Sequence, residues 1–263
     1  MILDKSKCIE HINDEEQILP LRKVLDKLEQ VIRNHTIEYT DFLDPYQRKL
    51  CYSFLNRIHD ISYHEEGGYH DAERKSIILF PDYREMRDIN NPISAVRVDG
   101  KFKFTDLNHR DYLGAIMALG VKREKIGDIL IHQDFGQIVL HDEILDYIKY
   151  NLESIGKESV EIKEIELCDV IKGDVDYKEI SSTVSSLRLD AVISSAYNMS
   201  RSSSSSYINK SRVKVNWQPI DQVSFEVNEG DMISIKGFGR MVLHRVKGTT
   251  RKGRRKLLIR ILK

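Results

Sequence analysis

Residues 186–240 read SLRLDAVISSAYNMSRSSSSSYINKSRVKVNWQPIDQVSFEVNEGDMISIKGFGR, and this stretch decides the fold of the last third of the chain. Its apolar residues between 187 and 196 recur at helical spacing, and Ser186 is placed to cap that helix. Ser200 is a second N-cap candidate, just ahead of the serine-rich run. The first half of the stretch therefore predicts two consecutive helices.

The second half of the stretch predicts strands. Val213 and Val215 alternate with basic and polar residues, which is typical of a strand with one buried face. Gly230-Asp231 predicts a turn that leads into a returning strand at 232–235. Beyond residue 240, two apolar runs flank the basic loop 247–256, which predicts a hairpin with a cationic tip.

Charge is distributed unevenly along a chain whose net charge is zero. Residues 182–263 contain 16 Lys and Arg but only 5 Asp and Glu, a balance of +11, so the remainder has a balance of −11. A basic segment of this size attracts polyanions through phosphate contacts and counterion release. We therefore expect the last third to bind nucleic acid and the acidic remainder to face away from it.

The order of signals in residues 186–240 resembles the small RNA-binding domain of ribosomal protein S-four, here called the S-four domain. The residues that carry the resemblance are Arg188-Leu-Asp190, Ser200-Arg-Ser202, Ile208, Val213-Lys-Val-Asn216, Gly230-Asp231 and Ile233. The resemblance implies that the two helices and the adjoining strand contact structured RNA. Asp190 is expected to orient Arg188 or Arg201 and to take no part in chemistry.

Two positions depart from the S-four pattern. Ser211 stands where the family has a glycine in a left-handed conformation, so it should either cost some stability or alter the turn. The run Ser202–Ser206 replaces charged residues, and it predicts weaker RNA contact. A poorly helical stretch is the alternative to a helix here, because serine competes for backbone hydrogen bonds.

The candidate RNA-binding residues are basic or polar side chains on the expected exposed edge and on the hairpin tip. They are Arg188, Arg201, Ser202, Lys210, Arg212, Lys214, Asn216, Lys236, Phe238, Arg240, Lys252, Arg254 and Arg255. Asn216 and Trp217 are expected to shape the edge. Phe238 has two interpretations, stacking on a base or packing on the domain itself. We expect one continuous surface from Arg188 through Arg240 to the tip.

The rest of the chain predicts two further parts. The first part, residues 1–73, is predicted to be a helical N-terminal region. One helix is expected over 13–33. Another begins at Pro45 with an Asp44–Gln47 capping box and runs to Ile58. Residues 74–172 are expected to form a central α/β domain. Lys172 to Ser186 are expected to be a linker, and the S-four-like domain is expected at 182–263. The central elements are strands at 76–80, 93–98, 101–104, 129–131, 137–140 and 160–167, and helices at 108–119 and 142–155. The fold class is therefore α+β.

A wider pattern resembles the bacterial YlmH family over nearly the whole chain. It consists of Gly67-Gly-Tyr69, Ala72-Glu-Arg74, His109-Arg-Asp-Tyr-Leu-Gly114, Lys122-Arg-Glu-Lys-Ile-Gly-Asp128, Trp217 and Lys236-Gly-Phe-Gly-Arg240. The resemblance implies a central domain like an RNA-recognition module and a C-terminal S-four domain. It also implies binding to rRNA of the large ribosomal subunit and rescue of stalled ribosomes that carry peptidyl-tRNA.

Several classes of protein are disfavoured. His109-Arg-Asp111 and Asp134-Phe-Gly136 mimic kinase signatures, but Ile116 stands where a kinase has its asparagine. The three cysteines are far apart and no histidine pair has metal spacing, so we expect no metal, no cofactor and no disulfide framework. No signal peptide and no membrane-length apolar run is visible, so we expect a cytoplasmic monomer without a membrane partner.

The leading hypothesis is a non-enzymatic RNA-binding factor, with no catalytic residue assigned. An RNA-modifying enzyme that uses the S-four domain for docking is the first alternative. A scaffold associated with cell division is the second. Arg188-Leu-Asp190 lacks the sequence context of a pseudouridine synthase motif, so it does not favour the enzyme.

Overall fold

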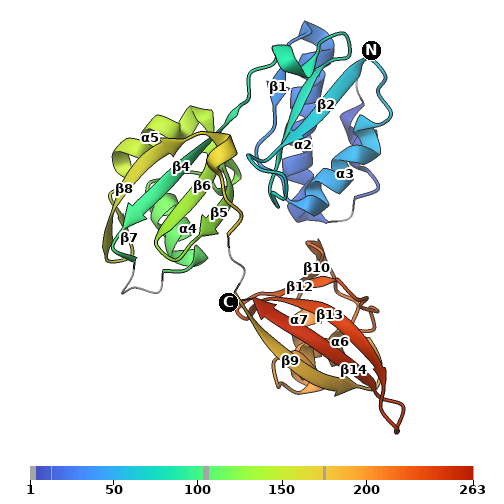
Figure 1. Ribbon diagram of the computed structural model, residues 1–263. Coiled ribbons are helices and arrows are strands. Elements are labelled where there is room, and N and C mark those ends of the chain that lie inside the picture. The colour runs from blue at the N-terminus through green and yellow to red at the C-terminus, as the bar shows by residue number, and fades with distance from the viewer. Residues whose placement is uncertain (1–3, 13, 103–106, 174–175, 263) are drawn as a thin grey trace. The chain divides into compact units, whose positions relative to one another are not determined.

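The computed structural model describes residues 4–12, 14–102, 107–173 and 176–262. The chain divides into two compact units, Met1–Asp174 and Val175–Lys263 (Figure 1). Helices and antiparallel sheets occur in both units, so the predicted α+β class is confirmed. The boundaries of the three predicted domains stay a prediction.

The N-terminal part of the first unit packs helices on a small sheet. Its elements are α1 (Lys5–Ile9), α2 (Glu15–Asn34), β1 (Glu38–Tyr39), α3 (Pro45–Leu55), β2 (Ile61–Glu66) and β3 (Ser76–Pro81). The capping box predicted at Asp44 and Gln47 is present, with both of its hydrogen bonds formed. The helix ends at Leu55, three residues before the predicted end at Ile58.

This part is helical, as predicted, but it also contains a sheet that was not predicted as such, in the order β1-β3-β2. The strand predicted at 76–80 exists as β3, but it pairs with β1 and β2 and not with the central sheet. β1 and β2 could not be recognised from the sequence. β1 has only two residues, and β2 is a polar strand without a fully buried side chain.

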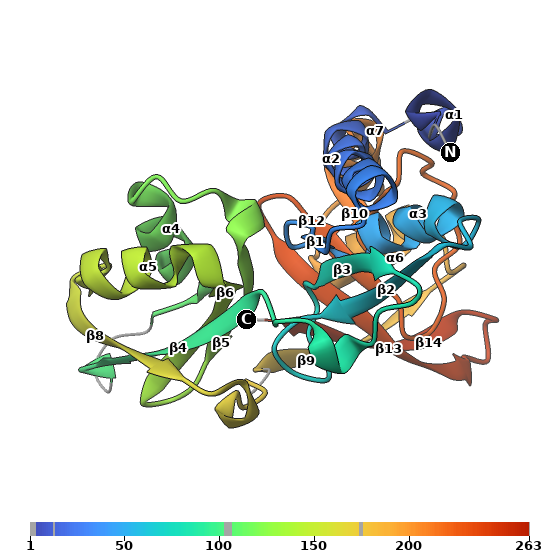
Figure 2. The same ribbon diagram turned by 90° about the horizontal axis from the view of Figure 1, so that it is seen from above.

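The central part of the first unit is a five-stranded antiparallel sheet in the order β5-β6-β4-β8-β7. Its strands and helices are β4 (Ile93–Gly100), α4 (His109–Ala118), β5 (Ile126–Ile131), β6 (Phe135–His141), α5 (Leu145–Asn151), β7 (Ser154–Ile155) and β8 (Glu158–Ile165). Short 3-10 turns lie at Met86–Asp88, Arg123–Lys125, Asp142–Ile144 and Leu167–Asp169. Figure 2 shows α4 and α5 on the same face of this sheet.

The hairpin predicted through Asp134-Phe-Gly136 is confirmed by the pairing of β5 with β6. The strand predicted at 101–104 falls partly on residues 103–106, which lie outside the described part of the chain; β4 pairs with β6 and β8. One other prediction was wrong. The helix predicted to run to 155 ends at Asn151, where Ser154–Ile155 leave the helix to form β7.

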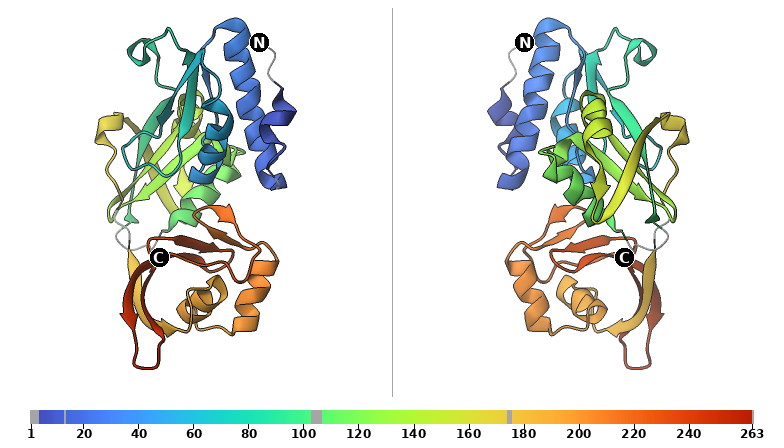
Figure 3. Two further views of the ribbon diagram at one scale, coloured as in Figure 1. Left: turned by 90° about the vertical axis from the view of Figure 1, so that its right-hand side faces the viewer. Right: turned by 90° about the vertical axis from the view of Figure 1, so that its left-hand side faces the viewer.

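The second unit is a six-stranded antiparallel sheet that carries two helices on one face, α6 (Leu189–Ala196) and α7 (Arg201–Asn209). Its strands, in chain order, are β9 (Tyr177–Val184), β10 (Val213–Val215), β11 (Gln218–Pro219), β12 (Met232–Ile235), β13 (Gly239–Thr249) and β14 (Arg255–Leu262). The order across the sheet is β11-β10-β12-β13-β14-β9. Figure 3 shows the β13–β14 hairpin, as predicted, with its tip beyond the rest of this unit.

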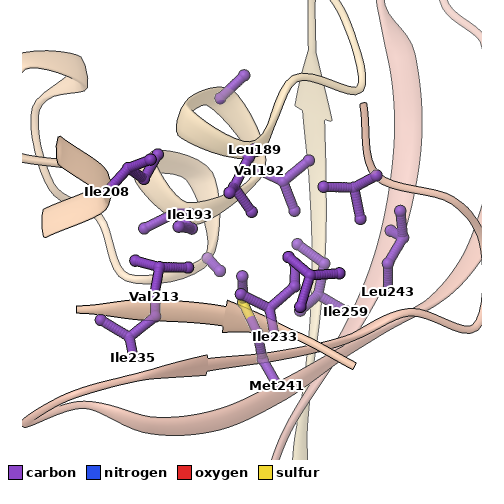
Figure 4. Close-up of a cluster of buried hydrophobic side chains, with 14 of the residues drawn as sticks. Leu189, Val192, Ile193, Ile208, Val213, Ile233, Ile235, Met241, Leu243 and Ile259 are labelled. Atoms are coloured by element: carbon purple, nitrogen blue, oxygen red, sulfur yellow. The ribbon is translucent and has the colours of Figure 1, made fainter. Parts of the chain in front are cut away.

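A single hydrophobic core joins the helices to the sheet (Figure 4). Leu189, Val192 and Ile193 point from α6 toward Val213 and Ile233 in the strands, and all five are fully buried. Burial of alternate residues along β10 and β12 therefore fixes which face of the sheet turns toward the helices. The intervening residues point to the opposite face.

The predicted linker at 172–186 was wrong, because most of it is β9, which pairs with β14 over eight residues. β9 exposes most of its side chains and buries only Val184, so its sequence lacks the apolar alternation of a half-buried strand. The start of α6 also differs from the prediction. Arg188 and not Ser186 is its N-cap residue, and the Leu189 N–H donates to the Phe225 carbonyl.

The serine run is helical. Ser200 caps α7 by accepting the N–H of Ser203, and Ser204 is fully buried, where its hydroxyl donates to the carbonyl of Asp190 in α6. A small side chain at 204 thus lets the two helices pack closely. Ser211 has φ 52°, so it occupies the left-handed conformation expected where the S-four pattern has glycine.

Candidate RNA-binding surface

Arg188 and Arg201 meet at one buried carboxylate. Arg188 Nε lies 3.2 Å from Asp190 Oδ1, and Arg201 Nε lies 2.9 Å from Asp190 Oδ2. The Asp190 side chain is only 5% exposed, whereas the arginine side chains are 43% and 47% exposed. The role predicted for Asp190 is therefore confirmed: it holds two half-exposed guanidinium groups in place at the starts of α6 and α7.

The protonation state of Asp190 follows from this geometry. Burial by itself raises the pKa of the carboxyl, but the hydrogen bonds from Arg201 and Arg188 outweigh it and hold the pKa below its ordinary value. Asp190 is therefore ionised at neutral pH. Because each guanidinium has five N–H donors, both retain donors that can meet a phosphate in a bidentate fashion.

A second group of candidates lies on two adjoining turns. Lys210 and Arg212 flank Ser211 between α7 and β10, and the Lys236 N–H donates to the Arg212 carbonyl over 3.0 Å. All three basic side chains belong to exposed residues. Ser202, at the exposed start of α7, has its hydroxyl 2.9 Å from that of Ser200.

Phe238 follows Lys236 in the turn between β12 and β13. Its ring makes edge-to-face contacts with Tyr197 and Tyr207, at centroid distances of 5.2 and 5.4 Å. The residue is nevertheless 40% exposed. Phe238 thus packs on the domain, as one of its two interpretations holds, and keeps part of its ring accessible beside Lys236.

Lys214 and Arg240 do not lie with Arg188 and Arg201, which corrects the expectation of one continuous edge. Lys214 stands between buried Val213 and Val215, so it points away from α6 and α7. Arg240 precedes buried Met241, and both Lys214 and Arg240 are register partners of Ser234. The two side chains therefore lie on the face of the sheet that is opposite to the helices.

Asn216 and Trp217 form the turn beside this opposite face. The Asn216 side chain donates to Asp231 over 2.7 Å and accepts the N–H of Met232 over 2.9 Å. The Arg240 guanidinium lies 5.9 Å from the centroid of the Trp217 ring. The turn is thus fixed to β12, and its indole contacts a basic side chain.

The hairpin tip carries Lys252, Arg254 and Arg255, which are all exposed. Arg254 differs from the other two, because its guanidinium donates to the carbonyl and hydroxyl oxygens of Thr183 in β9, at 2.6 and 3.2 Å. Part of the donor set of Arg254 is therefore used to hold the hairpin against β9.

The first unit contains a polar cleft that the sequence did not indicate. It has a volume of about 900 Å³ and is lined by α2, the loop after β1, residues 122–125 and the end of β6. Lys125 bridges Asp41 and Glu143, so cations and anions alternate along it. His141, 5% exposed, lies against Phe42, and its Nε2 makes no hydrogen bond with the described residues.

The open face of the central sheet carries another cluster that the sequence did not indicate. The Arg97 guanidinium lies 3.6 Å from the centroid of the Phe135 ring, and His132 stacks on the same ring at 4.4 Å. Beside them, the Gln137 amide donates to the Asp169 carbonyl and accepts the N–H of Ile171. Segment 169–171 thus covers part of this sheet face.

Within the described residues, no three His, Cys, Asp or Glu side chains are grouped as metal ligands. No helix in the same residues combines the length and the apolar character needed to cross a membrane.

Comparison with known proteins supplies the family. Three family models match the chain: "YlmH, N-terminal" at residues 16–84, "Putative RNA-binding domain in YlmH" at 88–169 and "S4 domain" at 187–233. The ribosome-associated protein quality control protein P2 of Bacillus subtilis (strain 168) is 35% identical over 247 residues, which are 94% of this chain and 95% of that protein. A solved structure, the cell division protein ylmH from Streptococcus pneumoniae, is 27% identical with a TM-score of 0.51, and the match covers 60% of this chain and 96% of that one. The chain therefore belongs to the YlmH family, with two family-specific parts followed by an S-four domain.

Proposed function

We propose that this protein is a non-enzymatic factor that binds structured RNA on the ribosome through the helix face of its S-four domain. The observation that carries the proposal is the Arg188–Asp190–Arg201 cluster. Two guanidinium groups are held by one ionised carboxylate and remain half exposed, which pre-organises a site for adjacent phosphates. Lys210, Arg212 and Lys236 add three exposed basic residues on the turns that follow α7 and β12.

The finer assignment follows the family. We infer that the RNA is rRNA of the large ribosomal subunit, with peptidyl-tRNA as a further partner, and that the factor acts as a cytoplasmic monomer in the rescue of stalled ribosomes. The name of the Bacillus subtilis relative, ribosome-associated protein quality control protein P2, supports this assignment. The excess of 11 positive charges in residues 182–263 supports binding to a polyanion.

Ribosome co-sedimentation at several salt concentrations tests the proposal. Neutralising Arg188 and Arg201 alone would leave the buried Asp190 carboxylate without its partners, so the variant to use is Arg188→Gln/Asp190→Asn/Arg201→Gln. Losing two phosphate contacts should reduce the slope of log affinity against log salt by about 1–2. Asp190→Asn alone is the matched control. Wild-type sedimentation by the folded triple variant would refute the assignment.

A further inference from the structure

The second unit presents a basic and aromatic surface on the side of its sheet that faces away from the helices. Pro219, Lys214, Ser234 and Arg240 are consecutive register partners across β11, β10, β12 and β13. Neighbouring strands lie about 4.8 Å apart, so the two basic residues start about 10 Å apart. This row, here called the outer row, contains no acidic side chain.

Trp217 stands at one end of the outer row in a conformation that a bulky residue rarely adopts. Asn216 has φ 47° and Trp217 has φ 66°, and Val215 pairs with Gln218, so the two residues form a tight hairpin turn with both φ angles positive. Such turns favour Asn followed by Gly. Tryptophan in the glycine position is unfavourable for the backbone, so the stability of the turn does not explain its presence.

The fold holds this turn in place. The Asn216 N–H donates to the Met232 carbonyl over 2.8 Å, while its side chain bonds Asp231 and the Met232 N–H. The indole is half-buried beside the Arg240 guanidinium. An unfavourable backbone conformation that the surroundings enforce is typical of residues placed for binding.

A second pair of aromatic and arginine lies on the same sheet face. The next row of register partners is Met232, Val242, Arg260 and Glu179. The Arg260 guanidinium lies 4.3 Å from the centroid of the Tyr177 ring and 2.9 Å from Glu179. The outer row adds Lys214 and Arg240 to the basic residues of this face, and Arg240 lies beside Trp217.

We propose that the outer row is a second RNA-binding site, specific for a single-stranded segment, in which a base stacks on Trp217 and phosphates contact Lys214 and Arg240. An aromatic ring next to basic side chains on the face of a sheet is an arrangement that binds unpaired nucleotides without reading their sequence. The site rests on the proposed RNA-binding function but uses the face opposite to Arg188 and Arg201. The S-four domain would then hold a structured RNA on one face and an unpaired strand on the other.

Intrinsic fluorescence tests the site directly, because Trp217 is the single tryptophan of the chain. The full-length protein is titrated with a short oligouridylate, and stacking should quench the emission in a saturable manner. The variant Lys214→Gln/Arg240→Gln should weaken binding about tenfold or more. The control Lys49→Gln/Lys157→Gln removes the same charge from two exposed positions of the first unit and should weaken binding less.

Two results would overturn the inference. One is a saturated protein–oligonucleotide complex, verified by the anisotropy of labelled RNA, whose Trp217 emission is unchanged. The other is quenching by polyglutamate but not by oligouridylate, which would assign the outer row to an acidic protein. Ribosome co-sedimentation of the Arg188→Gln/Asp190→Asn/Arg201→Gln variant is measured separately. A negative fluorescence result would therefore refute RNA binding by the outer row without refuting RNA binding through Arg188 and Arg201.

Discussion

Arg201, the first residue of α7, donates its Nε–H over 2.9 Å to a carboxylate oxygen of Asp190, which lies in the preceding helix and is 5% exposed. This contact joins two helices and positions a cation at the same time. The stability of the domain and its affinity for RNA therefore depend on the same ion cluster, and the two effects must be separated by the choice of variant.

Asp190→Asn should destabilise the second unit. The substitution removes the charge from hydrogen bonds made by both Arg188 and Arg201, and charged hydrogen bonds of this kind contribute about 1.5–3 kcal/mol each. Since the asparagine still accepts one bond, a net loss of about 1–3 kcal/mol in the free energy of unfolding is expected. Urea unfolding measures it. An unchanged transition would show that the cluster does not stabilise the helix pair.

The stability of the first unit should fall as the pH drops below about 6.5. Burial, followed by the charge of Lys125, lowers the pKa of His141 in the folded protein. The unfolded chain therefore binds a proton at a pH at which the folded chain does not. The stability that this neutral histidine contributes is present above the unfolded pKa and is lost as the pH falls through the folded pKa.

His141→Gln should reduce this pH dependence, because the amide cannot be protonated. The measurement is the urea midpoint of the first-unit transition at pH 7.5 and pH 5.5. The exposed His70→Gln is the matched control and should keep the wild-type difference. An equal difference in all three proteins would show that His141 does not cause the loss.

Trp217→Gly should be more stable than Trp217→Ala by about 1 kcal/mol. Both variants lose the indole and its contact with Arg240, but only glycine adopts φ 66° without a steric cost. Thermal unfolding of the two variants, compared at equal protein concentration, gives the difference. If alanine were the more stable, the backbone at 217 would carry no conformational cost.

Ser211→Gly should stabilise the turn between α7 and β10 by about 1 kcal/mol for the same reason, since Ser211 has φ 52°. Ser211→Ala keeps a Cβ atom and should give no gain. Chemical denaturation distinguishes the two variants. The positions of Lys210 and Arg212 on either side should not change, so RNA affinity is expected to be the same.

Elements with strong local signals could be predicted from the sequence. The Asp44–Gln47 capping box fixed the start of α3, and the alternation of Val213 and Val215 identified β10. β9 could not be recognised, because an edge strand that buries only Val184 lacks the alternation on which strand prediction depends. β2 could not be predicted for the same reason, since none of its side chains is fully buried.

The sequence indicated which residues belong to the candidate site better than it indicated where they lie. Asp190 was correctly expected to orient arginines, because a carboxylate two residues after Arg188 at a helix start has a short reach to it. The separation of Lys214 from Arg188 was missed, although the buried neighbours of Lys214 imply it. The cleft at His141 gave no sequence signal, because its walls come from segments about a hundred residues apart.

A density map of this protein bound to the large ribosomal subunit would show whether the helix face of the S-four domain binds rRNA. We expect the starts of α6 and α7 to lie against rRNA, with the guanidinium groups of Arg188 and Arg201 within hydrogen-bond distance of backbone phosphates. A bound complex in which both arginines face solvent, while another part of the chain makes the rRNA contacts, would contradict this expectation.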